Sequence, residues 1–256
     1  MARSSRFLFE QLVRRELRQK YQGSALGVAW YLINPLVLMA AYWFLFDVVL
    51  QTFDIPDYPL FLLCGLVVWI FFSQSLQQAA TSLLDQGALI RKARFPREAI
   101  PASVVVVQLL TFLVVLVLLG VVTVAIRGTL EPALLLLPVV LAALAGFVLG
   151  AALAVAVLHA FYRDVAPILA AALLPWFFLS PIFFSVDRLT ERDAARFVLE
   201  WVNPVAPYIT ALREVLYAGE VPDVAVLVYI VVGAAVALLG GRALFRRLQG
   251  ELAVVV

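Results

Sequence analysis

Charged residues and metal-binding side chains are scarce in this 256-residue sequence. Only 14% of the residues are charged, against 64% that are apolar, and the chain has one cysteine and one histidine. A single cysteine excludes an internal disulfide, and one histidine with one cysteine argues against a metal site built from this chain alone. The net charge of +2 argues against a nucleic-acid partner. No segment matches the phosphate-binding pattern G-x-x-x-x-G-K-[ST], so we expect no nucleotide-binding loop of that type.

Long apolar runs make up most of the chain, and their surface is too large for a single soluble core. About 20 apolar residues in a helix cross the ~30 Å hydrocarbon layer of a bilayer. The sequence therefore predicts an all-α integral membrane protein, one domain over residues 1–256, with six transmembrane helices. The predicted spans are residues 28–50, 59–83, 99–126, 133–158, 166–184 and 222–241, the last followed by a tail to residue 256.

The distribution of lysine and arginine predicts that both termini are cytoplasmic. With a cytoplasmic N-terminus, fourteen of the 19 Lys and Arg residues fall in inside segments, as the positive-inside rule requires. The remaining five are Arg127, Arg188, Arg192, Arg196 and Arg213. The basic residues near the N-terminus are not followed by a short apolar core and a cleavage site, so we expect no cleaved signal peptide.

Residues 1–27 are predicted to form an amphipathic helix on the inner membrane surface. Apolar residues recur at helical spacing from Phe9 to Tyr21, while arginines occupy the other faces. The alternative is a basic tail without fixed structure. Before the last span, residues 185–221 turn from polar to apolar and are interrupted by Asn203, Pro204 and Pro207. This pattern predicts re-entrant helices, which enter the membrane and return without crossing it.

No predicted span has an ionisable group near its centre. Ion-coupled carriers usually place paired charges at that depth, so a secondary transporter is disfavoured and active transport would need energy from a partner. The second half of the second span is polar but uncharged, with Gln74, Gln78 and Thr81 on one helical stripe. This stripe either lines a path for a neutral, hydroxyl-rich substrate or provides hydrogen bonds between helices.

The fourth and fifth spans carry further signals. Gly146, Gly150 and Ala154 predict close backbone approach between helices. The fifth span contains three prolines, which invite kinks where protein or a water-filled cavity satisfies the freed backbone groups. Aromatic residues gather near its outer end, either as the usual interfacial belt or as rings on which sugars stack. They are Trp176, Phe177, Phe178, Phe183 and Phe184.

The hypothesis that the protein is an enzyme depends on two residues only. Ser24 and His159 would both lie near the inner face, as the start of an intramembrane hydrolase site. No third group is identified that would orient the imidazole, and catalytic triads are defined by geometry rather than by composition. We therefore expect His159 to be an ordinary interfacial residue.

Four ordered segments resemble a known family. They are Lys20-Tyr-Gln-Gly-Ser-Ala-Leu-Gly-Val-Ala-Trp30 with Asn34-Pro35, the stretch Leu89–Pro101, Phe161-Tyr-Arg-Asp-Val165, and Trp201-Val-Asn-Pro-Val-Ala-Pro-Tyr208. In this order, at the ends of the predicted spans, they resemble the permease subunits of type-2 ABC exporters, which move polysaccharides, O-antigen and teichoic acids across bacterial membranes. The resemblance covers nearly the whole chain.

The resemblance implies roles for particular residues. Residues 84–98 would form a cytoplasmic coupling helix that docks on an ATPase subunit. The docking residues would be Leu89, Arg91, Lys92, Arg94, Phe95, Pro96, Arg97 and Glu98. The alternative is a positively charged loop that only determines the membrane topology. The substrate entrance would comprise Tyr21, Gly23, Gly27, Trp30 and Tyr31, with the glycines permitting a sharp turn into the first span. The channel lining and exit would comprise Gln74, Gln78, Thr81, Trp176, Phe177, Phe178, Phe183, Trp201 and Tyr208.

As a member of such a family, the chain is expected to be a non-enzymatic half-transporter in the bacterial inner or plasma membrane. It would pair with a second copy of itself and with two separate ATPase subunits, which would hold ATP and Mg²⁺, and it would need no cofactor of its own. The expected substrate is a lipid-linked (polyprenyl-linked) glycan such as O-antigen or a cell-wall polysaccharide. The alternatives are a teichoic-acid exporter permease and a non-conducting scaffold for an ATPase or glycosyltransferase.

Overall fold

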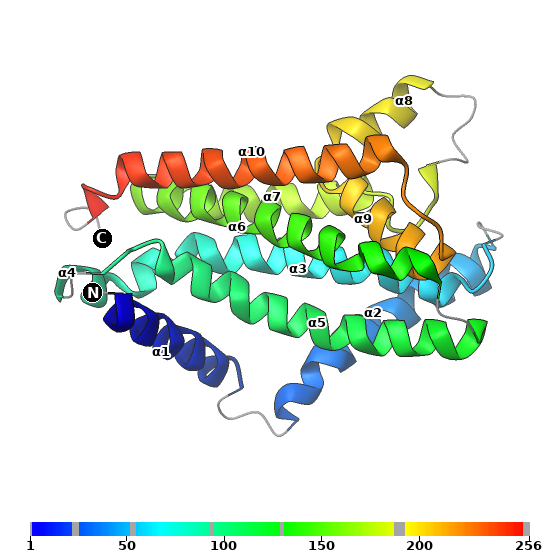
Figure 1. Ribbon diagram of the computed structural model, residues 1–256, viewed down its shortest axis with the longest axis horizontal. Coiled ribbons are helices and arrows are strands. Elements are labelled where there is room, and N and C mark those ends of the chain that lie inside the picture. The colour runs from blue at the N-terminus through cyan, green and yellow to red at the C-terminus, as the bar shows by residue number, and fades with distance from the viewer. Residues whose placement is uncertain are drawn as a thin grey trace.

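The computed structural model describes residues 2–21, 26–51, 55–92, 95–128, 131–186 and 193–252. Within these ranges every regular element is helical, which confirms the predicted all-α class. Long helices run side by side along the molecule, and the start of α1 and the end of α10 lie at the same end of the bundle as α4 (Figure 1). We refer to this as the α4 end.

Five helical stretches are long and apolar enough to cross a membrane. They are Leu32–Val49, Tyr58–Asp85, Ala99–Arg127, Pro132–Phe161 and Val224–Leu248. The first combines α2 (Trp30–Trp43) with the π-helix η2 (Phe44–Val49); the others are α3 (Tyr58–Asp85), α5 (Ala99–Arg127), η3 (Pro132–Leu136) with α6 (Leu137–Phe161), and α10 (Val224–Leu248). They correspond to the predicted spans one to four and six.

The fifth predicted span, residues 166–184, is shorter than the sequence suggested. Helix α7 (Val165–Phe178) has 14 residues, about 21 Å at ~1.5 Å per residue, and the chain then turns. Pro181 has no backbone N–H to continue the helix, and the residue before a proline disfavours helical backbone. The predicted end at residue 184 is therefore wrong, and the count of six spans stays a prediction.

The segment before the last span folds into two short helical pieces with a turn between them. Helix α8 (Asp193–Phe197) continues into the π-helix η5 (Val198–Val202), and α9 (Ala206–Arg213) continues into η6 (Glu214–Ala218). As predicted, the chain turns at Asn203 and Pro204, whereas Pro207 lies in the first turn of α9, where proline is tolerated. Helix α8 projects from the bundle and α9 returns into it (Figure 1).

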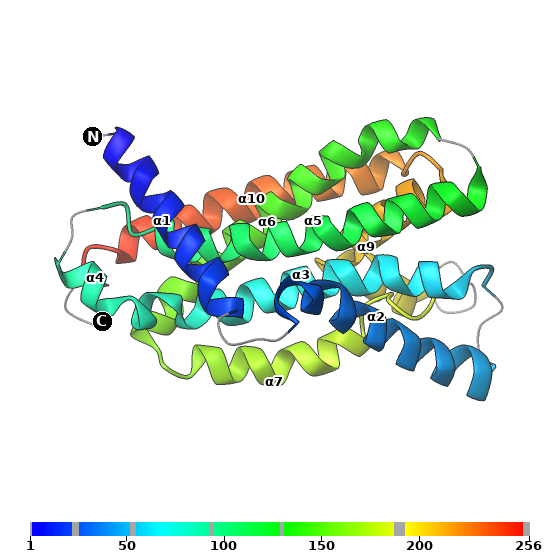
Figure 2. The same ribbon diagram turned by 90° about the horizontal axis from the view of Figure 1, so that it is seen from below.

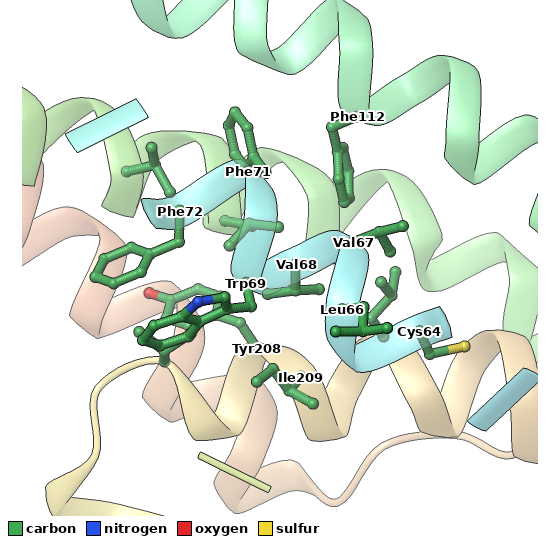
Figure 3. Packing of buried hydrophobic residues seen from close by; sticks show 14 of the residues in the cluster. Cys64, Leu66, Val67, Val68, Trp69, Phe71, Phe72, Phe112, Tyr208 and Ile209 are labelled. Carbon is green, nitrogen blue, oxygen red and sulfur yellow. The ribbon is translucent and has the colours of Figure 1, made fainter. Parts of the chain in front are cut away.

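Helix α3 is the centre of the core. Within its apolar window 78% of residues are buried, against 6% in the first span. Figure 3 shows Phe71 of α3 beside Phe112 of α5, and their ring centroids are 5.2 Å apart. Trp69 of α3 and Tyr208 of α9 belong to the same buried cluster. Because other helices surround α3 on several sides, the first half of its sequence is almost entirely apolar, and polar residues appear only in its second half.

Glycines bring α6 and α10 into direct backbone contact. This agrees with the close helix approach that Gly150 indicated in the sequence. A methyl group on Gly150 would overlap the backbone of Ala237 and Leu238, and one on Gly241 would overlap the carbonyl of Gly150. Gly146 is less tightly placed, since a methyl group there would lie 3.6 Å from the Cβ of Ala234. Small residues allow this approach because no side chain separates the two helices.

Candidate coupling and substrate sites

The predicted coupling segment begins with the last turn of α3 and is helical only in part. Helix α4 (Gly87–Lys92) has six residues. Its Ile90 is buried in a small cluster at the α4 end, together with Leu12 of helix α1 (Ala2–Tyr21) and Phe245 of α10. Arg91 and Lys92 are exposed at its end. The short helix is therefore anchored to several long helices while its basic end faces outward.

Leu89 and Phe95 are half-buried against this same cluster, and Pro96 is exposed. Arg94, Gly23 and Ser24 lie outside the described residues, and the side chain of Tyr31 is not described. The same holds for the side chain of Tyr21, whose backbone ends α1.

Arg97 and Glu98 contact the end of α10 within the chain. Arg97 Nη1 donates to the carbonyl of Gln249. The carboxylate of Glu98 accepts from Arg242 Nε at 3.2 Å and from Arg246 Nε at 3.1 Å. We call these two ion pairs the Glu98 clamp. It was not predicted from the sequence, although two arginines four positions apart on the last helix lie on one face and could share an acidic partner.

We expect the substitution Glu98→Arg to lower the stability of the solubilised protein by about 1 kcal/mol, because two partly exposed ion pairs become repulsive and such pairs contribute ~0.2–1 kcal/mol each. Thermal unfolding in detergent measures this change. Adding Arg242→Glu and Arg246→Glu should restore most of the loss. If the triple variant is no more stable than Glu98→Arg alone, the clamp does not operate in solution.

Helix α1 lies across α3 and α5 (Figure 2). Arg15 Nη1 donates to Gln86 Oε1 at 2.8 Å. Near the end of the helix, Lys20 Nζ donates to Gln108 Oε1 at 2.8 Å and to Thr111 Oγ1 at 3.4 Å. Leu12 is buried, so the amphipathic helix predicted from the sequence is fixed by its apolar face and by polar contacts at two points.

Two cavities lie between α1 and the long helices. We call the first the Lys20 cavity; it has a volume of about 260 Å³. Its polar lining comprises Lys20, Asn34, Gln74, Gln108 and Thr111. Its apolar wall includes Val67, Ile70, Phe71, Phe112 and Val115. The second, the Arg15 cavity, has a volume of about 280 Å³ and is lined by Arg15, Glu16, Gln19, Gln78, Thr81 and Asp85 among others.

The polar stripe of α3 faces these cavities. Gln74 lines the Lys20 cavity, and Gln78 and Thr81 line the Arg15 cavity. Trp30, at 49% exposure, stands at the Lys20 cavity beside the start of the first span. Gly27 has a φ of +47°, so the turn that leads into α2 uses the left-handed backbone that glycine permits.

Burial lowers the pKa of Lys20 to about 8. The ammonium form is destabilised away from water, but it still outweighs the neutral amine at pH 7. The Lys20 cavity therefore combines a cation, several amide groups and an apolar wall. Such an arrangement suits an amphiphile with acceptor oxygens better than a cation or a hydrocarbon alone.

Of the predicted exit aromatics, three pack inside the chain. Phe177, Phe183 and Tyr208 are buried. The hydroxyl of Tyr208 donates to the carbonyl of Ile230 at 2.9 Å, and its ring stacks on Phe147 at 4.9 Å. These contacts join α9 to α6 and α10.

The other exit aromatics are more accessible. Phe178 is 53% exposed. Trp176 is half-buried and donates its indole N–H to Asn203 Oδ1 at 2.9 Å, which ties α7 to the turn before α9. Trp201 makes an edge contact with Tyr229 at 5.7 Å.

Arg213, one of the five basic residues predicted to lie in outside segments, is a buried cation. Its guanidinium donates to the carbonyls of Pro181 at 2.9 Å, Ile182 at 3.1 Å and Phe61 at 3.3 Å, and lies 3.4 Å from the centroid of the Phe61 ring. A methyl group on Gly65 would come within 3.0 Å of it. The arginine thus satisfies carbonyls that the chain frees where α7 ends.

His159 is buried at the end of α6, and its Nδ1 accepts from the backbone N–H of Ala166 at 3.2 Å. It therefore serves the turn between α6 and α7. Its position at the membrane interface stays a prediction.

Apolar spanning helices around polar cavities, with a basic helix at one end, define a multi-pass membrane transport subunit. The sequence profile of the family described as ABC-2 type transporter matches residues 8–217. The chain belongs to this family, which implies a membrane location and an ATPase partner.

Among similar curated proteins is the O-antigen export system permease protein RfbA of Myxococcus xanthus, 32% identical over 97% of this chain and 95% of that protein. Two proteins of the same name from Klebsiella pneumoniae are also similar. One is 27% identical over 98% of this chain and 96% of its own length, and the other 29% over 83% and 82%. Because the relatives are named as permeases of an export system, the chain is a transport subunit rather than an enzyme.

Proposed function

We propose that this protein is the permease of an ATP-driven exporter of a lipid-linked polysaccharide of the O-antigen type. The observation that carries the proposal is the near full-length similarity to permeases named for O-antigen export. Two copies would enclose a channel in a bacterial inner or plasma membrane, with both termini cytoplasmic. Two separate ATPase subunits would supply the energy through bound ATP and Mg²⁺.

The α4 end is the surface that we assign to the ATPase. Arg91 and Lys92 are exposed there, and exposed charges steer association with an acidic partner. Ile90 connects this surface to a cluster that includes residues of α1, α3, α5, α6 and α10. A displacement of α4 by the ATPase would therefore be transmitted to most of the bundle through packed side chains, because protein interiors are close-packed.

The substrate would enter near Trp30 and pass along polar groups of α3. Gln74, Gln78 and Thr81 offer uncharged donors and acceptors to hydroxyl-rich sugars. Phe178 and Trp201, from α7 and η5, would contribute aromatic surface at the exit.

Proteoliposomes containing the permease and its ATPase test this function. We expect ATP-dependent movement of a polyprenyl-linked glycan across the bilayer, and no movement with the permease alone. A complex that hydrolyses ATP but moves no glycan would point to a scaffold. Movement of a polyprenyl-linked teichoic acid but not of an O-antigen-type glycan would reassign the substrate.

The charge-reversal variant Arg91→Glu/Lys92→Glu should weaken binding of the ATPase about tenfold or more, corresponding to ~1.4 kcal/mol of lost interaction, while the permease still folds. Arg247→Glu is the matched control, because Arg247 is also exposed near the α4 end but lies on α10. Affinity is measured by titrating immobilised permease with the ATPase. Equal weakening by both variants would contradict the assignment of α4.

A further inference from the structure

Gln108 is buried in the wall of the Lys20 cavity with one side of its amide unsatisfied. The residue is 2% exposed. Its Oε1 accepts from Lys20, whereas Nε2 has no hydrogen-bond partner among the described residues. A buried donor without an acceptor destabilises the folded protein. An acceptor atom inside the cavity would remove this destabilisation.

The polar groups around Gln108 favour a negatively charged ligand in the cavity. Lys20 brings its ammonium to the same place, and its position is set by Gln108 Oε1 and by Thr111 Oγ1. Thr111 donates its own hydroxyl to the carbonyl of Val107 at 3.0 Å, so it holds the lysine. The side-chain amides of Asn34 and Gln74 complete the polar lining, which contains no Asp or Glu among the described residues.

The remaining wall of the cavity is apolar. Phe71 and Phe112 are buried, and Val67 and Val115 extend the same surface. Trp30 stands half-exposed beside them. A ligand that fills this space must therefore have an oxygen-rich anionic head and an apolar chain.

We infer that the Lys20 cavity binds one phosphate-bearing amphiphile, with the phosphate at Lys20 Nζ and Gln108 Nε2 and the chain against Phe71 and Phe112. A phosphate has several acceptor oxygens, so it can accept from the ammonium and the amide at once. Two sources share this chemistry: a phospholipid of the bilayer and the polyprenyl phosphate of a lipid-linked substrate. Only the second source rests on the proposed function.

The experiment uses the permease with its ATPase, stripped of lipid in detergent and examined by native mass spectrometry. The probes are phosphatidylglycerol and farnesyl phosphate, with diacylglycerol and farnesol as phosphate-free counterparts. We expect one phosphate-bearing probe per permease, bound about tenfold or more tightly than its counterpart, a difference of ~1.4 kcal/mol. Preference for phosphatidylglycerol assigns the site to a bilayer lipid, and preference for farnesyl phosphate to the substrate.

Two variants and a control keep the inference open to refutation. Gln108→Glu removes the donor and adds a negative charge, yet its carboxylate can still pair with Lys20, so the fold is retained; phosphate binding should fall about tenfold or more. Lys20→Met should act in the same direction. Arg18→Met removes an exposed charge from the same helix and should leave binding unchanged. Unchanged binding in folded Gln108→Glu, or equal binding of the phosphate-free probes, would overturn the inference, whatever the transport assay shows.

Discussion

The substitution Gly241→Ala is expected to prevent stable packing of α6 against α10. A single methyl group at this position would overlap the carbonyl of Gly150. Backbone atoms cannot rotate away as a side chain can, so the two helices would have to separate along their contact. We expect a loss of about 3 kcal/mol or more, at or above the upper end of ordinary overpacking. Detergent-solubilised protein should show little monodisperse material by size-exclusion chromatography.

The neighbouring glycine provides the matched control. A methyl group on Gly240 would have no heavy atom within 4 Å, although helix propensity and sequence context are almost the same. Gly240→Ala should therefore fold as the unmodified chain does, or slightly better because alanine favours helix. Gly150→Ala should reproduce the defect from the other side of the contact. A monodisperse, thermally stable Gly241→Ala protein would show that α6 and α10 are not in backbone contact.

The substitution Arg213→Met is expected to unfold the region where α7 ends. The variant keeps an unbranched apolar stem but removes the donors to Pro181, Ile182 and Phe61. The carbonyls of Pro181 and Ile182 lie outside any helix and therefore lose a charged donor without an intrahelical bond to replace it. We expect a loss of about 3 kcal/mol or more, because hydrogen bonds to charged groups contribute ~1.5–3 kcal/mol each. The thermal unfolding midpoint in detergent measures the effect, and transport should be lost with it.

The substitution Arg213→Lys distinguishes the contribution of the positive charge from that of the guanidinium geometry. Arg213→Lys keeps the positive charge but cannot reproduce the planar fork that reaches three carbonyls, so its stability should lie between those of the methionine variant and the unmodified chain. Arg127→Met removes an exposed arginine at the end of α5 and should change stability little. If Arg213→Met is as stable as Arg127→Met, the buried guanidinium does not hold the α7 turn.

Properties that depend on neighbouring residues were predictable from the sequence. Five of the six predicted spans coincide with apolar helices long enough to cross a membrane, because an uninterrupted apolar run in lipid must satisfy its own backbone and therefore forms a helix. The stripe of Gln74, Gln78 and Thr81 follows from helical spacing alone. Gly150 signalled a close helix contact for the same reason, although its partner Gly241 was not identified.

The remaining features depend on residues far apart in the chain. The turn after α7 is held by Arg213, which lies more than thirty positions away from the carbonyls of Pro181 and Ile182 and about 150 from that of Phe61. The cavities exist because α1 lies across α3 and α5. Glu98 meets Arg242 only because α5 begins beside the last turns of α10. The sequence by itself determined which segments are helices and that they belong in a membrane, since local apolarity controls both. Only the tertiary structure decided which cations are buried and which polar groups face a cavity, because desolvation and hydrogen-bond partners are set by packing between distant segments.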